Sequence, residues 1–177
     1  LFTTRRLLRF MCTRVGGFII ASACVFNNMI DRNIDKKMER TKNRPLVQGL
    51  ISNKSALLFA SVLALIGGTI LYVYTNPLAL FISSIGFFIY VLLYSLWKSK
   101  TIYGTAIGSI AGAIPPVVGY CAASNRFDLG AFLLFIMLIF WQMPHFFSVA
   151  IMHLNDYRAA QMPLLPIEKG IWRTKVH

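Results

Sequence analysis

The chain has 177 residues, is 56% hydrophobic and has a mean hydropathy of +0.62, far above the value for a soluble domain of this size. Residues 55–97, 101–125 and 129–155 contain no Asp, Glu, Lys or Arg, and about 20 apolar residues are enough to cross a bilayer. The composition therefore excludes a soluble globular domain and predicts a polytopic, all-α bundle of transmembrane helices.

Basic residues outnumber acidic residues by 18 to 6, which gives a net charge of +12. Such an excess can indicate nucleic-acid binding, but in a membrane protein it more commonly reflects Lys and Arg gathered in cytoplasmic loops. We therefore expect the lipid bilayer, and no nucleic acid, as the partner of the basic residues.

The predicted elements begin with residues 1–14, a basic segment that contains four arginines and is not a clean span. A first helix is expected over residues 15–35, and its polar end runs into a basic loop at 36–54. Four more spans are expected at 55–74, 78–97, 103–123 and 129–153. In a bilayer each segment must satisfy its own backbone hydrogen bonds, and helices do so.

Alternating these spans across the membrane sorts the charges by side. The side reached by the end of the first helix receives thirteen basic residues, whereas the opposite loops, 75–77 and 124–128, hold only Arg126. The arginines of residues 1–14 do not fit this pattern. By the positive-inside bias, the basic side is the cytoplasm, or the matrix in a mitochondrion.

One polar stripe stands at the end of the first predicted helix. Asn27, Asp31 and Asp35 are four residues apart, so a helix places them on one face. They could be helix-end charges in water, but a carboxylate just inside the membrane costs about 2–3 kcal/mol, which favours a functional use. Oxygen ligands beside a basic loop suit a divalent metal that carries a phosphorylated substrate.

Other residues become candidates for substrate or metal binding because they lie near this stripe. Arg40, Lys42 and Arg44 could hold phosphate oxygens, although alone they would be ordinary loop charges. Asp156 is predicted at the same end of the bundle, because the topology returns the last span there. His145 is either a satisfied polar residue inside the bundle or a contact to a metal-bearing or acidic substrate.

The residues of this polar end carry a family resemblance. Asn27-Asn28-x2-Asp31-x3-Asp35 resembles the first aspartate-rich motif of the UbiA superfamily of intramembrane prenyltransferases. Within that superfamily the chain is most similar to the heme O synthases (protoheme IX farnesyltransferases). That closer similarity lies in Val25–Asn28 and Asp35–Val47, in Trp141-Gln142-Met143-Pro144-His145-Phe146, and in Asp156-Tyr157-x2-Ala160-x2-Pro163-x-Leu165-Pro166.

The resemblance implies a bundle of nine helices, of which this chain would supply about five. Residues 15–177 would be an internal part of that transmembrane domain, and residues 1–14 are unlike the family. The implied reaction is transfer of a farnesyl group from farnesyl diphosphate to a vinyl group of heme b, giving heme O for heme–copper oxidases. A bacterial inner membrane, or a mitochondrial one, is the implied location, with heme A synthase or oxidase-assembly proteins as partners.

The resemblance also implies roles for individual residues. Asn27, Asp31 and Asp35 would hold one Mg²⁺, and Asp156 would help to hold a second. The diphosphate would be bound by Arg40, Lys42, Arg44 and Lys98. Tyr157, with Tyr94, would stabilise cationic species, and His145 would approach the heme.

Two other functions stay open at this point. Another UbiA-type enzyme that prenylates a quinone precursor would share the aspartates but should lack the sequence motifs at 141–146 and 156–166. A non-catalytic heme-binding membrane subunit could keep His145 without any need for Asp31 or Asp35.

Overall fold

The computed structural model describes the backbone of residues 2–176 and the side chains of residues 16–175. The described residues form helices and loops without a strand, which confirms the all-α prediction. The basic side chains of residues 1–14 lie outside the described residues.

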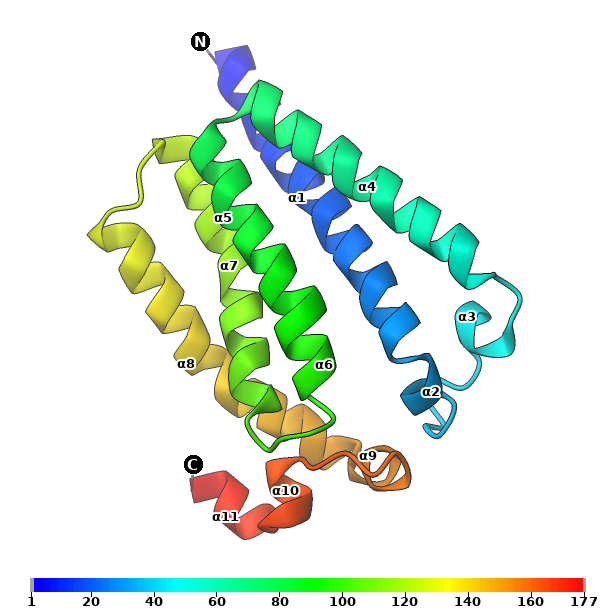
Figure 1. Cartoon of the computed structure of the whole chain (residues 1–177). Helices are drawn as coiled ribbons and strands as arrows, with labels where there is room; N and C mark the ends of the chain where they lie inside the picture. The colour runs from blue at the N-terminus through cyan, green and yellow to red at the C-terminus, as the bar shows by residue number, and fades with distance from the viewer. Residues whose placement is uncertain (1, 177) are drawn as a thin grey trace.

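The first two long helices, α1 (Phe2–Ile30) and α4 (Asn53–Tyr74), form an antiparallel pair (Figure 1). They approach closely at Gly67, where an added Cβ would lie 2.6 Å from Cγ1 of Ile19. The Ser22 hydroxyl donates a hydrogen bond of 2.6 Å to the Ala60 carbonyl across the same contact. Small residues and a polar bridge are the usual means by which helices pack in a membrane, where lipid is as apolar as the side chains.

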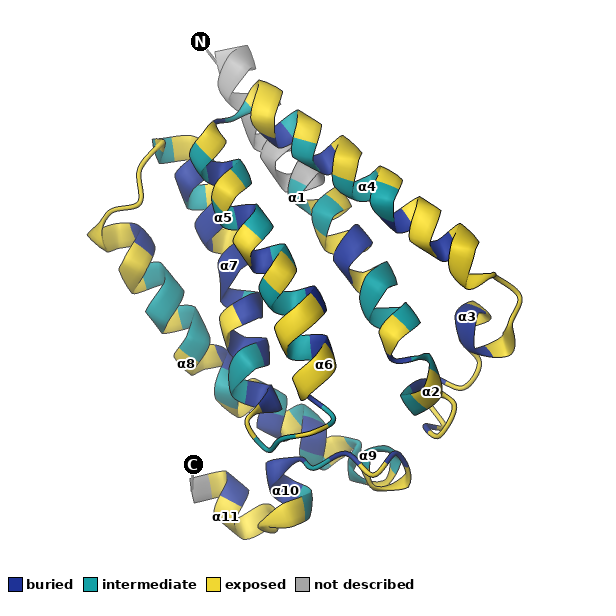
Figure 2. Cartoon of the chain, in the orientation of Figure 1, coloured by how far each residue is buried: buried dark blue, intermediate teal, exposed yellow. Residues whose placement is uncertain are grey.

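The second group of helices is arranged around α7 (Gly104–Ser124), which packs against both α5 (Pro77–Phe88) and α8 (Leu129–Met152). Ten residues of α7 are buried, and Figure 2 shows it as the darkest of the long helices. The apolar segment that starts with α5 continues without a loop through a π-helical turn, η1 (Ile89–Tyr94), into α6 (Ser95–Trp97).

In the part of the chain that the structure describes, four segments are long and apolar enough to cross a membrane: Asn53–Tyr74, Pro77–Trp97, Gly104–Ser124 and Leu129–Met152. Their ends lie within two residues of four spans expected from the sequence. Large apolar side chains on these helices, such as Phe140 (72% exposed), face outward, as lipid contact requires. The protein is therefore an integral membrane protein.

The first expected span differs from the structure at its end. Instead of one helix to residue 35, α1 ends at Ile30, Asp31 lies in a turn, and α2 (Arg32–Asp35) follows. Hydrogen bonds of 2.8 Å from the Asp31 and Asp35 amides to the carbonyls four residues earlier keep the helical spacing across this turn. The polar stripe therefore survives the interruption.

Short helices gather at the end of the bundle where α1 finishes (Figure 1). They are α2, α3 (Pro45–Gln48), α9 (Leu154–Ala159), α10 (Leu165–Glu168) and α11 (Ile171–Val176). The backbone amide of Glu39 donates to Oδ1 of Asp156 at 3.2 Å, so the segments that carry Asp35 and Asp156 touch. The expectation that both acidic segments lie at one end is confirmed.

At the opposite end, Asn76 fixes the turn between α4 and α5. Its side-chain oxygen accepts from the Ala79 amide at 2.8 Å, and its amide nitrogen donates to the carbonyls of Cys121 and Ala122 on α7. We expect Asn76→Ala to lower the free energy of unfolding by about 2 kcal/mol, because it removes a helix cap and leaves carbonyls of α7 without a donor.

Unfolding in detergent by titration with sodium dodecyl sulfate measures this effect. Asn76→Ser keeps the cap but is too short to reach α7, so its stability should fall between those of the wild type and Asn76→Ala. A wild-type midpoint for Asn76→Ala would contradict the assigned role.

Candidate functional site

A buried ion pair forms the centre of the polar end. Nζ of Lys98 contacts Oδ2 of Asp31 and donates to Oδ1 of Asn27 at 2.7 Å. The side chains of Lys98 and Asp31 are only 9% and 8% exposed. Lys98 enters from the helix that ends at Trp97, and its ammonium also lies 4.9 Å from the ring centroid of Tyr94.

A second pair lies one helical turn further along the stripe. Nη1 of Arg44 donates to Oδ2 of Asp35 at 2.7 Å and to Oδ1 of Asn28 at 2.8 Å. Asp35 is buried, whereas Arg44 keeps a third of its side chain exposed. Arg44 is the residue before Pro45, which opens α3, so an extended backbone holds it at the mouth of the site.

The π-helical turn η1 is followed by Ser95, which adds a polar group to the Lys98–Asp31–Asn27 cluster. The Ser95 hydroxyl lies 3.0 Å from both the carbonyl of Tyr90 and Oδ1 of Asn27. A π turn widens the helix locally and is common at functional sites. Ser95 is 2% exposed and was not among the residues expected from the sequence. Its position three residues before Lys98, on the same helix face, was the available signal.

One carboxylate oxygen in this cluster has no partner. Oδ1 of Asp31 is buried and receives no hydrogen bond. Burial without a partner disfavours the charged form of a carboxylate, whereas the Lys98 ammonium at Oδ2 favours it. A further cation at Oδ1 would favour the ionised form, which is the electrostatic condition for a metal ligand.

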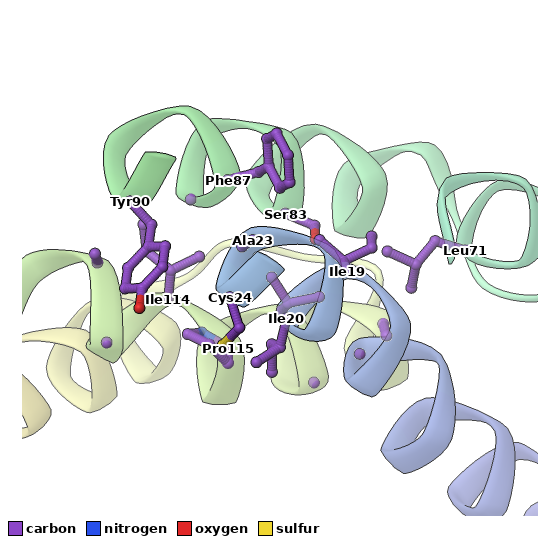
Figure 3. A pocket seen from close by; sticks show the side chains of 17 residues that line it. Ile19, Ile20, Ala23, Cys24, Leu71, Ser83, Phe87, Tyr90, Ile114 and Pro115 are labelled. Atoms are coloured by element: carbon purple, nitrogen blue, oxygen red, sulfur yellow. The ribbon is translucent and has the colours of Figure 1, made fainter. Parts of the chain in front are cut away.

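An apolar cavity of about 230 Å³ lies between the helices of the bundle (Figure 3). Residues of α1, α4, α5, η1 and α7 line it. Cys24 and Tyr90 lie in its wall, four residues before Asn28 and eight before Lys98, so the cavity extends inward along the helices that carry the site. A cavity of this volume with mostly apolar walls suits a hydrocarbon chain better than a macrocycle.

The remaining expected residues are placed differently. Asp156 binds the Glu39 amide, and Tyr157 packs beside Met38. No group of three or more His, Cys, Asp or Glu side chains within the described part of the chain could hold a metal ion. The second ion expected at Asp156 is separate from the one expected at Asp31 and Asp35, and this two-ion arrangement stays a prediction; Oδ1 of Asp156 here accepts from the neighbouring loop.

Two of the expected phosphate-binding residues lie outside the cluster. Lys42 forms an exposed ion pair with Glu39, and Arg40 is exposed on the same loop. His145 is exposed on α8, where its ring stacks on Trp141 with centroids 5.6 Å apart and an angle of 8° between planes. The structure thus unites Asn27, Asp31, Asp35, Arg44 and Lys98.

Comparison with known sequences places this arrangement in a family. The sequence model of the UbiA prenyltransferase family matches residues 1–177. The chain belongs to the UbiA prenyltransferase family. Its helical membrane architecture is the one expected for a UbiA protein.

Curated relatives point to one branch of the UbiA family. The chain is 61% identical over 168 residues to a protein of Protochlamydia amoebophila named protoheme IX farnesyltransferase, and covers 59% of it. It is 55% and 54% identical, over 170 residues, to proteins of the same name from Pectobacterium atrosepticum and Yersinia enterocolitica. About 95% of the chain takes part in these matches, but it spans only 57–59% of the relatives' length. No solved structure shows a significant match.

Proposed function

We propose that this protein transfers a farnesyl group from farnesyl diphosphate to a vinyl group of heme b, producing heme O for heme–copper oxidases. The observation that carries the proposal is the junction of two unlike environments. Buried carboxylates paired with Lys98 and Arg44 lie at the polar end of the bundle, and an apolar cavity lies along the same helices, with Cys24 and Tyr90 in its wall. A prenyl diphosphate has the same division, with a charged head and a long apolar tail.

The carboxylates fit the Mg²⁺ that such a reaction would use. Mg²⁺ keeps several waters and is bound by one or two carboxylates together with substrate phosphates, so a cage of three protein ligands is not required. Oδ1 of Asp31 is buried without a partner, and Asp35 lies one turn away. When bound, Mg²⁺ would neutralise charge on the diphosphate and orient it. A second ion at Asp156 would need its free oxygen, Oδ2.

The chain's own cations then account for the departure of the diphosphate. Arg44 is partly exposed and can bind phosphate oxygens, and Lys98 supplies a charge that is more deeply buried in the cluster. Negative charge grows on the diphosphate as its bond to C1 of the farnesyl group breaks, and fixed positive groups stabilise that charge. The aromatic ring of Tyr94, beside Lys98, can face the allylic cation at C1.

The acceptor is proposed from the relatives rather than from the cavity. Their shared name specifies protoheme IX, and identity of 53–61% extends over nearly the whole chain. The vinyl carbon of heme b would form the new bond to C1, and water would add a hydroxyl group to the adjacent carbon, releasing a proton. We propose that the site faces the cytoplasm at a bacterial inner membrane, because it lies at the end of the bundle that carries the basic loops, and such loops are usually cytoplasmic.

A transfer assay with alternative acceptors tests the proposal. The protein expressed from its full reading frame is purified in detergent and given Mg²⁺, farnesyl diphosphate and either heme b or a hydroxybenzoate precursor of quinones. We expect farnesylated, hydroxylated heme only. A prenylated hydroxybenzoate with unchanged heme would instead assign a quinone pathway enzyme.

A further inference from the structure

One apolar side chain interrupts the basic loop between α2 and α3. Residues 36–44 contain six charged residues and a single apolar one, Met38. Met38 is only 3% exposed, although Lys37 and Glu39 on either side are exposed. A loop whose only role was to carry charge in water would not bury this side chain. The burial of Met38 therefore indicates a specific packing site, called its receptor below.

The receptor is formed by segments more than 110 residues away in the sequence. Met38 packs in one buried cluster, with partly buried neighbours that include Tyr157. The other buried members are Ala150, Ala160, Met162 and Leu164. The adjacent hydrogen bond from the Glu39 amide to Asp156, of 3.2 Å, fixes the loop backbone at the same place. An apolar contact and a polar contact therefore dock the loop together.

The docked loop also carries two residues of the candidate site. Asp35 precedes Met38 by three positions, and Arg44 follows it by six. Between them Thr41 is 1% exposed, and its hydroxyl donates to the carbonyl of Asp35 at 3.1 Å. The stretch from Asp35 to Thr41 is thus closed by a hydrogen bond between its ends, and the middle of this stretch is held against α8, α9 and the segment that follows α9.

We propose that Met38 is a positioning residue, which docks the 36–44 loop onto α8 and α9 and so holds Asp35 and Arg44 in the geometry that receives a diphosphate. The inference rests on the proposed function for the identity of the substrate. If diphosphate binds only to molecules whose loop is docked, the apparent affinity equals the intrinsic affinity multiplied by the docked fraction. Undocking therefore weakens binding, while the rate of reaction from the bound state is unchanged.

Trypsin provides a direct measure of docking, because Lys36, Lys37, Arg40 and Lys42 are exposed cleavage points on the loop. In the full protein, Met38→Ala should raise the rate of cleavage within this loop at least about tenfold, since truncation of the buried side chain leaves the loop undocked in most molecules. Met38→Leu, which keeps the apolar volume, should behave as wild type. Met38→Gln, of similar length but polar, should be cleaved fast. Met152→Ala is the matched control, because Met152 is 71% exposed.

Binding and turnover decide whether docking positions the site. For Met38→Ala we expect about tenfold weaker binding of magnesium pyrophosphate by calorimetry and an equal rise in KM for farnesyl diphosphate, with kcat within about twofold of wild type. Wild-type cleavage rates in both Met38→Ala and Met38→Gln would overturn the docking claim. Faster cleavage with unchanged pyrophosphate affinity would overturn the positioning role. If the wild-type protein does not farnesylate heme, the proposed function fails, but the cleavage and pyrophosphate measurements still decide this inference.

Discussion

Replacing Lys98 with Met is expected to lower the free energy of unfolding by about 3–5 kcal/mol, because the Asp31 carboxylate would stay buried without its cation. Both side chains are more than nine-tenths buried, so water cannot take over the role of Lys98. Uptake of a proton by Asp31 would bring the cost toward the lower end of this range. Unfolding by sodium dodecyl sulfate in detergent measures the loss.

Two comparison variants separate the ion pair from other effects of the substitution. Lys100→Met removes an exposed charge two residues further on and should leave stability unchanged. The double variant Lys98→Met with Asp31→Asn should recover part of the lost stability, because no unpaired charge remains, but it should stay inactive. If Lys98→Met is as stable as the wild type, the buried pair does not hold the helices together.

Replacing Asp31 with Asn is expected to lower the rate of heme O formation by about 100-fold or more, because the substitution removes the charge of the carboxylate that we propose as a ligand of the metal–diphosphate. The side chain keeps its shape, so the protein should still insert into the membrane. Asp31→Ala and Asp35→Ala should abolish the reaction for the same reason. Rates are measured in membranes by quantifying the heme product, with protein amount checked by immunoblot.

Asp128→Asn is the matched control for these substitutions. Asp128 is exposed at the opposite end of the bundle, where it accepts hydrogen bonds from Tyr120 and from the Ala131 amide. Its replacement removes one carboxylate without touching the site, so activity should be unchanged. Wild-type turnover by Asp31→Asn or by Asp35→Ala would refute the metal–diphosphate assignment.

The helical spans were predictable because they depend on local composition. Uncharged stretches of 20 or more residues leave a chain few alternatives in a bilayer, and the Asn76–Pro77 turn marks one boundary sharply. Topology then follows by alternation, which is how Asp31 and Asp156 could be placed at one end. The break at Asp31 was not predictable, because the turn preserves the four-residue hydrogen bonds that the helical spacing implies.

The pairing of the site residues needed the structure. Lys98 lies 67 residues from Asp31, and nothing in the sequence tells which cation meets which carboxylate. The partner of Asp156 is a backbone amide, which any residue supplies, so its contact with the 36–44 loop leaves no trace in the sequence. Met38 stands out in the sequence as the one apolar residue of 36–44, but the sequence does not tell what it packs against, because most of its neighbours come from distant segments.

The hemes extracted from cells test the central claim most directly. A bacterial strain without its own heme O synthase is given the full gene, the Asp31→Asn gene or an empty vector. The extracted hemes are separated by chromatography, and their masses are determined by mass spectrometry. We expect heme b carrying one added farnesyl group and one hydroxyl, present only with the wild-type gene. Unmodified heme b in all three strains would contradict this claim.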